Sequence, residues 1–202
     1  RPCLPERRQG LYIERAMAVE LGVLGLQGDY AAHGAMLDRL GATWHIVKKP
    51  SQLDGIDGLV MPGGESTTLI KLMDSSGLWK AIADYAALGK PIFGTCAGMI
   101  LVAKDVINPA QRSLGLIDIG VERNGYGRQI DSAEVGGIFR DAEGDRPMDM
   151  VFIRAPRITR LGDGVEALAE CRGDVVMARQ DRVVVASFHP ELTDDLTAHR
   201  YF

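Results

Sequence analysis

The fold of this chain is decided by the stretch Lys90-Pro91-Ile92-Phe93-Gly94-Thr95-Cys96-Ala97-Gly98-Met99-Ile100-Leu101-Val102-Ala103-Lys104. Its first four residues are typical of a short buried strand, and the apolar residues after Gly98 are typical of a helix. Between them lies a G-x-C-x-G pattern, the thiol version of the turn that exposes a nucleophile between a strand and a helix. We therefore predict a strand, a sharp turn and a helix, with Cys96 at the turn.

The residues around Cys96 favour a reactive thiol. Gly94 and Gly98 leave room for a turn that larger side chains would block. The first backbone N–H groups of the helix point toward the sulfur, and with the helix dipole they favour the thiolate. A small buried cysteine at the end of a strand is the alternative, and the motif alone does not decide between the two.

A second feature is the segment Val183-Val184-Val185-Ala186-Ser187-Phe188-His189-Pro190-Glu191, whose apolar start predicts a strand. In an extended chain His189 and Glu191 lie on one face, about 6–7 Å apart along the strand. His189 then faces the thiol while Glu191 holds the imidazole, which supplies the base and the orienting acceptor that a nucleophile needs. A histidine beside a proline turn, with a solvated glutamate, is the alternative, and the cysteine turn argues against it.

A third feature is the segment Leu59-Val60-Met61-Pro62-Gly63-Gly64-Glu65-Ser66-Thr67-Thr68, in which a buried strand runs into two glycines and a helix start. The glycines let the backbone approach a ligand closely and turn an N–H group inward. We predict an oxyanion hole whose donors are the N–H groups of Gly64 and Ala97. A phosphate cradle is disfavoured because this loop has neither nucleotide-binding glycine motif, and an ordinary strand-to-helix turn remains the alternative.

In this order, the three segments resemble the class I glutamine amidotransferases, which use a Cys-His-Glu triad. Within that class the chain is similar to the family of glutaminase subunits of pyridoxal 5′-phosphate synthases, which serve the deoxyxylulose-phosphate-independent pathway. The similarity extends from about Glu20 to Thr193. It also rests on the segments Gly22-Val23-Leu24-Gly25-Leu26-Gln27-Gly28, Val121-Glu122-Arg123-Asn124, Gly127-Arg128-Gln129-Ile130-Asp131-Ser132 and Val151-Phe152-Ile153-Arg154-Ala155-Pro156.

A triad of this kind implies hydrolysis of L-glutamine to L-glutamate and ammonia. The Cys96 thiolate attacks the side-chain carboxamide, His189 protonates the leaving ammonia and then activates water, and Glu191 orients His189. The resemblance implies that glutamine is held by Gly64, Glu65, Ser66, Arg123, Ile153 and Arg154. An arginine suits the α-carboxylate and Glu65 suits the α-amino group. From the residues alone, surface charge or an interface salt bridge is the alternative for the two arginines.

The resemblance also implies a partner. The ammonia passes to a separate (β/α)8-barrel synthase subunit in a hetero-oligomer for vitamin B6 biosynthesis, and docking of that subunit completes the oxyanion hole. The chain itself is expected to need no metal and no organic cofactor, because pyridoxal phosphate is the product of the complex. A glutaminase that feeds an imidazole-ring or purine synthase is one alternative, which the segment 151–156 argues against. A stand-alone cysteine hydrolase and a non-catalytic binding subunit are the others.

Length and composition agree with a single globular domain. The 202 residues are 46% apolar and carry a net charge of −4, which gives no indication of a nucleic-acid or acidic-membrane surface. No apolar run reaches the length of a membrane span. Three widely spaced cysteines favour a reducing cytoplasm over a disulfide framework, with Cys171 in a structural role and Cys3 without a function.

Strand and helix patterns alternate along the first half of the chain. They predict an α/β fold of one domain with a largely parallel central sheet, helices on both faces and a flavodoxin-like architecture, and the ligand site beyond the carboxyl ends of the strands. The second half is richer in short strands, with a polar hairpin or loop over Arg140–Pro147. Strands are predicted at 19–26, 44–47, 58–61 and 91–93, and helices at 30–40, 67–73, 79–88 and 99–104.

The two ends and one loop residue differ from the family pattern. Residues 1–17 have no periodicity and no signal-peptide core, so we expect a non-native or disordered N-terminal extension, with Met17 a plausible start. The amidotransferase domain is expected over residues 18–202. The family continues past its His-Pro-Glu segment with a C-terminal helix, so a stop at Phe202 predicts that this helix is truncated. Tyr126 stands where the family tends to have Phe.

Overall fold

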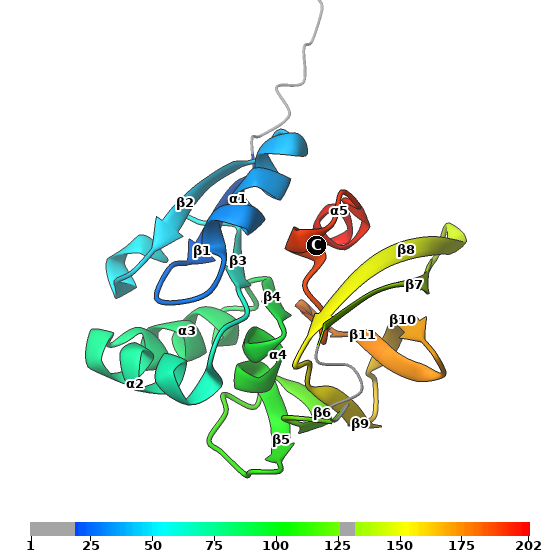
Figure 1. The fold of residues 1–202 in the computed structure, drawn as a ribbon. Helices are drawn as coiled ribbons and strands as arrows, with labels where there is room; N and C mark the ends of the chain where they lie inside the picture. The colour runs from blue at the N-terminus through cyan, green and yellow to red at the C-terminus, as the bar shows by residue number, and fades with distance from the viewer. Residues whose placement is uncertain (1–18, 126–131) are drawn as a thin grey trace, which may run out of the picture.

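Two β-sheets organise the residues that the computed structural model describes, which are 19–125 and 132–202 (Figure 1). The larger sheet has nine strands in the order β2-β1-β3-β4-β12-β11-β10-β7-β8. Its strands are β1 Glu20–Leu24, β2 Thr43–Val47, β3 Gly58–Met61, β4 Ile92–Thr95, β7 Ser132–Asp141, β8 Gly144–Ile153, β10 Glu166–Cys171, β11 Asp174–Gln180 and β12 Val183–Ala186. The smaller sheet consists of β5 Ala103–Ile107, β6 Ile117–Glu122 and β9 Arg157–Leu161.

The first half of the large sheet is parallel and doubly wound. Strands β2, β1, β3, β4 and β12 pair in parallel, each with its neighbour. The order β2-β1-β3-β4 reverses direction beside β1, as in flavodoxin-like sheets, where ligands bind beyond the carboxyl ends of the strands. The predicted α/β class and architecture are therefore confirmed.

The second half of the large sheet is antiparallel, which the sequence did not predict. Strand β11 pairs antiparallel with β12 and β10, and β7 pairs antiparallel with β10 and β8. Short turns connect β7 to β8, β10 to β11 and β11 to β12, whereas helices connect β1 to β2 and β3 to β4 in the parallel half. Between β10 and β11 only Arg172 and Gly173 intervene, and their φ angles of 53° and 86° suit a tight hairpin turn. The predicted hairpin at 140–147 is present as the turn between β7 and β8.

Helices cover both faces of the large sheet. They are α1 Tyr30–Arg39, α2 Ser66–Ser76, α3 Leu78–Ala87, α4 Ala97–Val102 and α5 Thr197–Tyr201, with the short 3-10 helices η1 Pro50–Gln52 and η3 Pro190–Leu192. The predicted strand bounds and the first three helices agree to within a few residues. The prediction of a helix over 99–104 is wrong at its end, because Ala103 leaves helical geometry and pairs with Ile117 of the small sheet.

The period-2 alternation of the parallel strands separates the core into two layers. Val60, Phe93 and Val184 pack in one layer with residues of α1, α5 and the β7–β8 hairpin. Leu59 and Val185 point to the other layer, which α2, α3, α4 and the small sheet complete. Burial on both faces explains why these strands read as continuous apolar runs.

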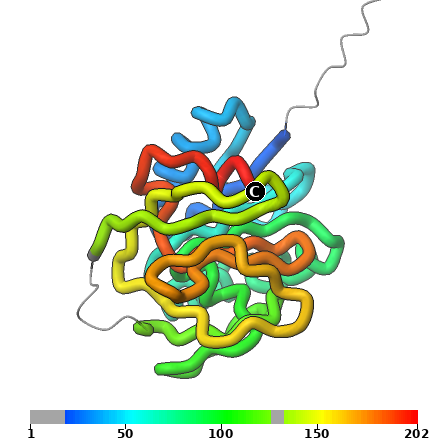
Figure 2. Tube along the Cα trace, turned by 90° about the vertical axis from the view of Figure 1, so that its right-hand side faces the viewer, coloured from blue at the N-terminus to red at the C-terminus, as the bar shows by residue number. Residues whose placement is uncertain are grey.

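The C-terminal residues pack into the first of these layers. The ring of Phe202 lies 5.5 Å from that of Phe93, and the ring of Tyr201 lies 5.3 Å from that of Phe139. Figure 2 shows the C-terminal segment running beside the β7–β8 hairpin. The expected truncation of a C-terminal helix stays a prediction, as do the assignments of residues 1–17 and Tyr126, which lie outside the described residues. Within residues 19–125 and 132–202, no helix has the length and apolarity to cross a bilayer.

Candidate active site

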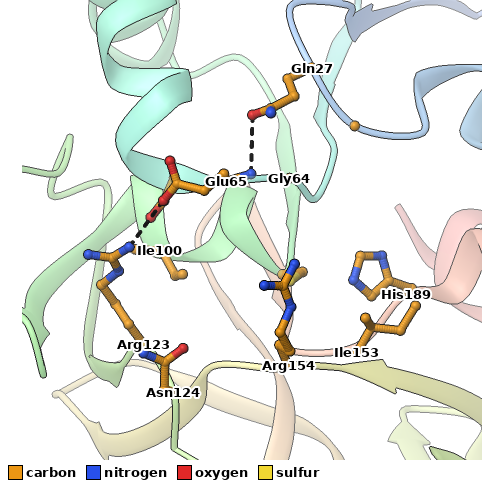
Figure 3. Close-up of a pocket in the computed structure, with 12 residues that line it drawn as sticks. Gln27, Gly64, Glu65, Ile100, Arg123, Asn124, Ile153, Arg154 and His189 are labelled. Carbon is orange, nitrogen blue, oxygen red and sulfur yellow. Dashed lines mark hydrogen bonds and ion pairs between the residues drawn. The ribbon is translucent and has the colours of Figure 1, made fainter. Parts of the chain in front are cut away.

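A cavity of about 580 Å³ opens where the carboxyl ends of the parallel strands meet (Figure 3). Adjacent parallel strands end at the same edge of the sheet, so the segments after β1, β3, β4 and β12 all reach this point. Loops of β6 and β8 complete the wall. The lining residues are Gln27, Gly28, Gly64, Glu65, Ser66, Cys96, Ile100, Arg123, Asn124, Ile153, Arg154 and His189. The site expected beyond the carboxyl ends of the strands is therefore present as a cavity.

Cys96 occupies a strained turn directly between β4 and α4. Its φ of 49° and ψ of −106° are rare for a residue with a side chain. A Cβ atom on Gly98 would lie 2.0 Å from the carbonyl oxygen of Met61, and one on Gly94 would lie 2.7 Å from the carbonyl carbon of Gly98. The Cys96 N–H donates to the carbonyl of Ala186 at 2.8 Å, which ties the turn to β12. The predicted strand, sharp turn and helix are confirmed, and the glycines are necessary for the turn.

His189 and Glu191 form the hydrogen-bonded pair that the sequence predicted. The Nδ1 atom of His189 lies 2.8 Å from Oε1 of Glu191, and Cys96 and His189 both line the cavity. Burial opposes a charge on His189, but the interactions with Cys96 and Glu191 outweigh it and raise the pKa of His189 to about 10. The pKa of Glu191 is lowered despite its burial, because His189 and His33 stabilise the carboxylate.

The predicted route to this pair is wrong. The chain is not extended through Glu191, since Pro190 begins the 3-10 helix η3 immediately after His189. Proline has a fixed φ that suits the first position of a helix. The turn brings the Glu191 carboxylate back to the imidazole, so the two side chains still meet.

The Gly63-Gly64 loop lies against both Cys96 and His189. A Cβ atom on Gly63 would lie 2.5 Å from Cε1 of His189 and 3.4 Å from Cβ of Cys96. Gly64 has a φ of 141°, a conformation that favours glycine. The loop therefore requires glycine at both positions. Gly63 leaves the space that His189 occupies, and Gly64 adopts a backbone conformation that other residues disfavour. Gly64 lines the cavity and Ala97 is the first residue of α4, directly after Cys96.

Gln27 lines the cavity and is a further functional candidate, to which the sequence motifs assigned no role. Its Oε1 accepts a hydrogen bond from the Glu65 N–H at 3.1 Å, which fixes the loop after β3 against the loop after β1 (Figure 3). Neighbouring Gly28 has a φ of 87°, and a Cβ atom there would lie 2.0 Å from the carbonyl oxygen of Gly63. Their position in the loop that follows the first predicted strand, at the edge where ligands bind, was the sequence signal that could have predicted both Gln27 and Gly28 as site residues.

Glu65 and Arg123 form an ion pair in the cavity wall. The Glu65 carboxylate caps α2, where it accepts from the backbone N–H groups of Thr67 and Thr68 and from their hydroxyls. The Thr67 hydroxyl contributes most to lowering the pKa of Glu65 to about 2, so the carboxylate is ionised at neutral pH. Arg123 Nη2 lies 3.3 Å from Glu65 Oε1, and its side chain is only 15% exposed. Arg123 is therefore not an ordinary surface charge.

The remaining predicted substrate residues line the cavity in different ways. Ile153 ends β8, and Arg154 follows it with a φ of 44° (Figure 3). Ser66 is buried, and its hydroxyl donates to Oε1 of Gln111 at 2.9 Å, so this side chain already has a protein partner. Ile100 and Asn124 also line the cavity and were not predicted as site residues. Cys171 lies apart from the site in β10, where burial raises the pKa of its thiol, in agreement with a structural role.

Known proteins resemble this chain over almost its whole length. The model of the SNO glutamine amidotransferase family matches residues 23–202. A relative from Solibacter usitatus, named pyridoxal 5'-phosphate synthase subunit PdxT, is 52% identical over 187 residues, which cover 91% of this chain and 97% of that protein. A relative of the same name from Thermosipho africanus is 49% identical over 184 residues, with coverages of 91% and 97%. A solved structure titled crystal structure of glutamine amidotransferase has a TM-score of 0.83 at 44% identity, and the match covers 90% of this chain and 95% of that one.

The fold and these matches together define the class of glutamine amidotransferases. Within that class, the chain belongs to the SNO glutamine amidotransferase family. The family resemblance inferred from the motifs is therefore confirmed.

Proposed function

We propose that this chain is the glutaminase subunit of a pyridoxal 5′-phosphate synthase, and that it hydrolyses L-glutamine to L-glutamate and ammonia. The observation that carries the proposal is that Cys96 and the hydrogen-bonded pair His189–Glu191 meet at the wall of a cavity of about 580 Å³. The family assignment supports glutamine as the substrate, and the names of the relatives support the pyridoxal phosphate complex.

In this proposal Cys96 is the nucleophile. Its thiolate attacks the side-chain carbonyl carbon of glutamine, and the backbone N–H groups of Gly64 and Ala97 stabilise the oxyanion. The bond between carbon and nitrogen then breaks, and the His189 imidazolium gives its proton to the departing ammonia. His189 next takes a proton from water as the water attacks the thioester, which releases glutamate and restores the thiolate. The raised pKa of His189 supports this role, because it keeps the acid protonated at neutral pH.

Charged groups in the cavity wall provide a means of binding the amino-acid end of glutamine. We assign the α-carboxylate to Arg123 and Arg154 and the α-amino group to the Glu65 carboxylate, with Gly64, Ser66 and Ile153 as further contacts. The low pKa of Glu65 supports this assignment, because it keeps a negative charge at the cavity. The carboxylate already accepts hydrogen bonds from Thr67 and Thr68, so the amino group adds to an existing network.

The ammonia is passed to a synthase partner. We propose that this partner is a (β/α)8-barrel subunit in a hetero-oligomer, and that its docking completes the oxyanion hole through the Gly63-Gly64 loop. In the scheme above, every proton and acyl transfer is carried out by side chains of this chain and water, so no step requires a metal or an organic cofactor. A cytoplasmic location stays a prediction.

Glutamate release from L-glutamine, with and without the synthase subunit, tests the proposal. We expect release that increases with the synthase and is lost in Cys96→Ala, since the nucleophile is then absent. Release that a purine or imidazole-ring synthase stimulates, and the pyridoxal phosphate synthase does not, would indicate a different complex. Release that no synthase affects would indicate a stand-alone hydrolase, and folded protein without any release would refute the glutaminase.

A further inference from the structure

Two buried histidines lie behind Glu191, on the side away from the cavity. His33 comes from α1 and is 0% exposed, and His199 comes from α5 and is 3% exposed. Their rings meet through Nδ1 of His33 and Nε2 of His199, 2.8 Å apart. Figure 1 shows α1 and α5 on the same side of the large sheet. The proposed mechanism does not use either side chain.

The other ring nitrogen of His33 faces the triad. Nε2 of His33 lies 3.2 Å from the hydroxyl of Thr95 and 3.3 Å from Oε2 of Glu191. This second carboxylate oxygen has no hydrogen-bond partner among the described residues, whereas Oε1 binds His189. A buried carboxylate oxygen without a donor is costly, and His33 Nε2 is the nitrogen that faces it.

The contacts of the two rings select one pair of tautomers. Nδ1 of His199 is buried and has no partner within the described part of the chain, so a proton there would be an unsatisfied donor. The proton of His199 therefore belongs on Nε2, which donates to Nδ1 of His33. His33 must then carry its own proton on Nε2, which is directed at Thr95 and Glu191.

We propose that His33 is a positioning residue for the glutaminase triad, that its Nε2–H, anchored on the Thr95 hydroxyl, stabilises the charge of the Glu191 carboxylate from behind, and that His199 fixes the tautomer that makes this possible. The inference rests on the proposed function only for its kinetic readout. It extends the series of side chains Cys96, His189 and Glu191 to two more residues. In this arrangement one oxygen of Glu191 hydrogen-bonds His189 and the other faces His33 Nε2 at 3.3 Å, so the carboxylate has a polar neighbour on each side.

The charges around His33 favour a neutral donor. Burial lowers its pKa most, and the His189 charge lowers it further, while Glu191 and Asp29 raise it. The pKa of His199 is lowered to about 3, again mainly by burial. A neutral His33 directs its N–H at the Glu191 carboxylate without cancelling the carboxylate charge, which remains available to the His189 imidazolium. Among the described residues, no group of three or more His, Cys, Asp and Glu side chains is arranged to hold a metal ion.

The test compares His33→Leu, which removes the donor, with His33→Gln, which retains an N–H group. We expect His33→Leu to lower kcat about tenfold with little change in KM, the size expected when a buried carboxylate loses the polar N–H group that faces it. The acid limb of the kcat/KM profile moves to higher pH, because the pKa of Glu191 rises when His33 no longer stabilises its carboxylate. His33→Gln recovers part of both effects. His45→Gln, on β2 and away from the cavity, is the matched control and keeps the wild-type profile.

A second readout does not depend on glutamine turnover. The rate of alkylation of Cys96 by iodoacetamide against pH reports the pairing of Cys96 with His189, and His33→Leu shifts that profile in the same direction. If the glutaminase proposal fails, no variant releases glutamate, but the alkylation profiles still decide the role of His33. His199→Phe keeps a ring beside Phe93 and removes the Nε2–H, so it shifts the profile even if His33→Leu does not fold. Wild-type profiles in folded His33→Leu or in His199→Phe overturn the inference.

Discussion

Gly63→Ala tests the account of the catalytic geometry with a single methyl group. The new Cβ atom would lie 2.5 Å from Cε1 and 3.2 Å from Nδ1 of His189. Carbon atoms make favourable contact at about 3.5 Å or more, so the imidazole or the loop must move by about 1 Å. A misplacement of about 1 Å at a catalytic group costs about 100-fold in rate, which corresponds to about 2.7 kcal/mol of activation free energy.

The assay for this variant is glutamate release in the presence of the synthase, together with thermal unfolding. Gly63 does not have a positive φ, so alanine adds steric conflict without backbone strain. Gly136→Ala is the matched control, because a Cβ atom there would meet nothing within 4 Å. We expect Gly63→Ala to fold and to lose about 100-fold in kcat, while Gly136→Ala keeps its activity. Wild-type kcat in Gly63→Ala would refute the close packing of this loop against His189.

Three further predictions concern charged groups of the site. Glu65→Ala lowers the free energy of unfolding by about 1 kcal/mol at pH 7, because α2 loses its N-cap. The pKa of Glu65 is lowered from 4.5 to about 2 in the folded protein, so this contribution is complete above pH 4.5 and is lost as pH falls toward 2. Urea titrations of wild type and variant should therefore converge at low pH. Glu191→Gln lowers kcat by about 100-fold or more. It also moves the alkaline limb of the activity profile to lower pH, because the carboxylate that helps to raise the pKa of His189 to about 10 is gone. An unchanged alkaline limb would contradict the pairing of His189 with Glu191. Arg123→Met raises KM about tenfold with a smaller change in kcat if Arg123 binds the glutamine carboxylate, whereas an unchanged KM measured by initial rates would remove Arg123 from the binding site.

The parallel half of the fold was predictable because its signals are local. Strand β3 has the predicted bounds of Gly58–Met61, since a fully apolar run is directly followed by Pro62 and two glycines. Strand β4 was predicted over 91–93 and spans Ile92–Thr95, where it ends in the glycine-flanked cysteine turn. In each case a few consecutive residues determine both the strand and the turn that ends it.

The antiparallel half depends on pairing between distant strands. Strand β10 pairs antiparallel with β7, and in the small sheet β6 pairs antiparallel with β9, and no short sequence pattern encodes these choices. The turn between β10 and β11 was also hidden, because Arg172 adopts a positive φ that the sequence gives no reason to expect. Tertiary packing decides such elements, and periodicity within one segment does not.

Some residues of the site could likewise be predicted from local motifs, and others depend on tertiary packing. Cys96, His189 and Glu191 lie in short motifs whose residue types match a nucleophile, a base and an acceptor, so they could be predicted together. His33 and His199 have no motif, and 166 residues separate them in the chain. Only the packing of α1 and α5 in one layer brings them together behind Glu191. The role of Gln27 likewise depends on a tertiary contact, the hydrogen bond that its Oε1 accepts from the Glu65 N–H.

The central claim is that Cys96 forms a covalent intermediate with glutamine. Rapid acid quench of the protein with L-glutamine and the synthase subunit, followed by peptide mass spectrometry, measures this directly. The account predicts a γ-glutamyl thioester on the peptide that contains Cys96, and none in Cys96→Ala. Glutamate release at the wild-type rate by Cys96→Ala, or an adduct on another residue, would contradict it.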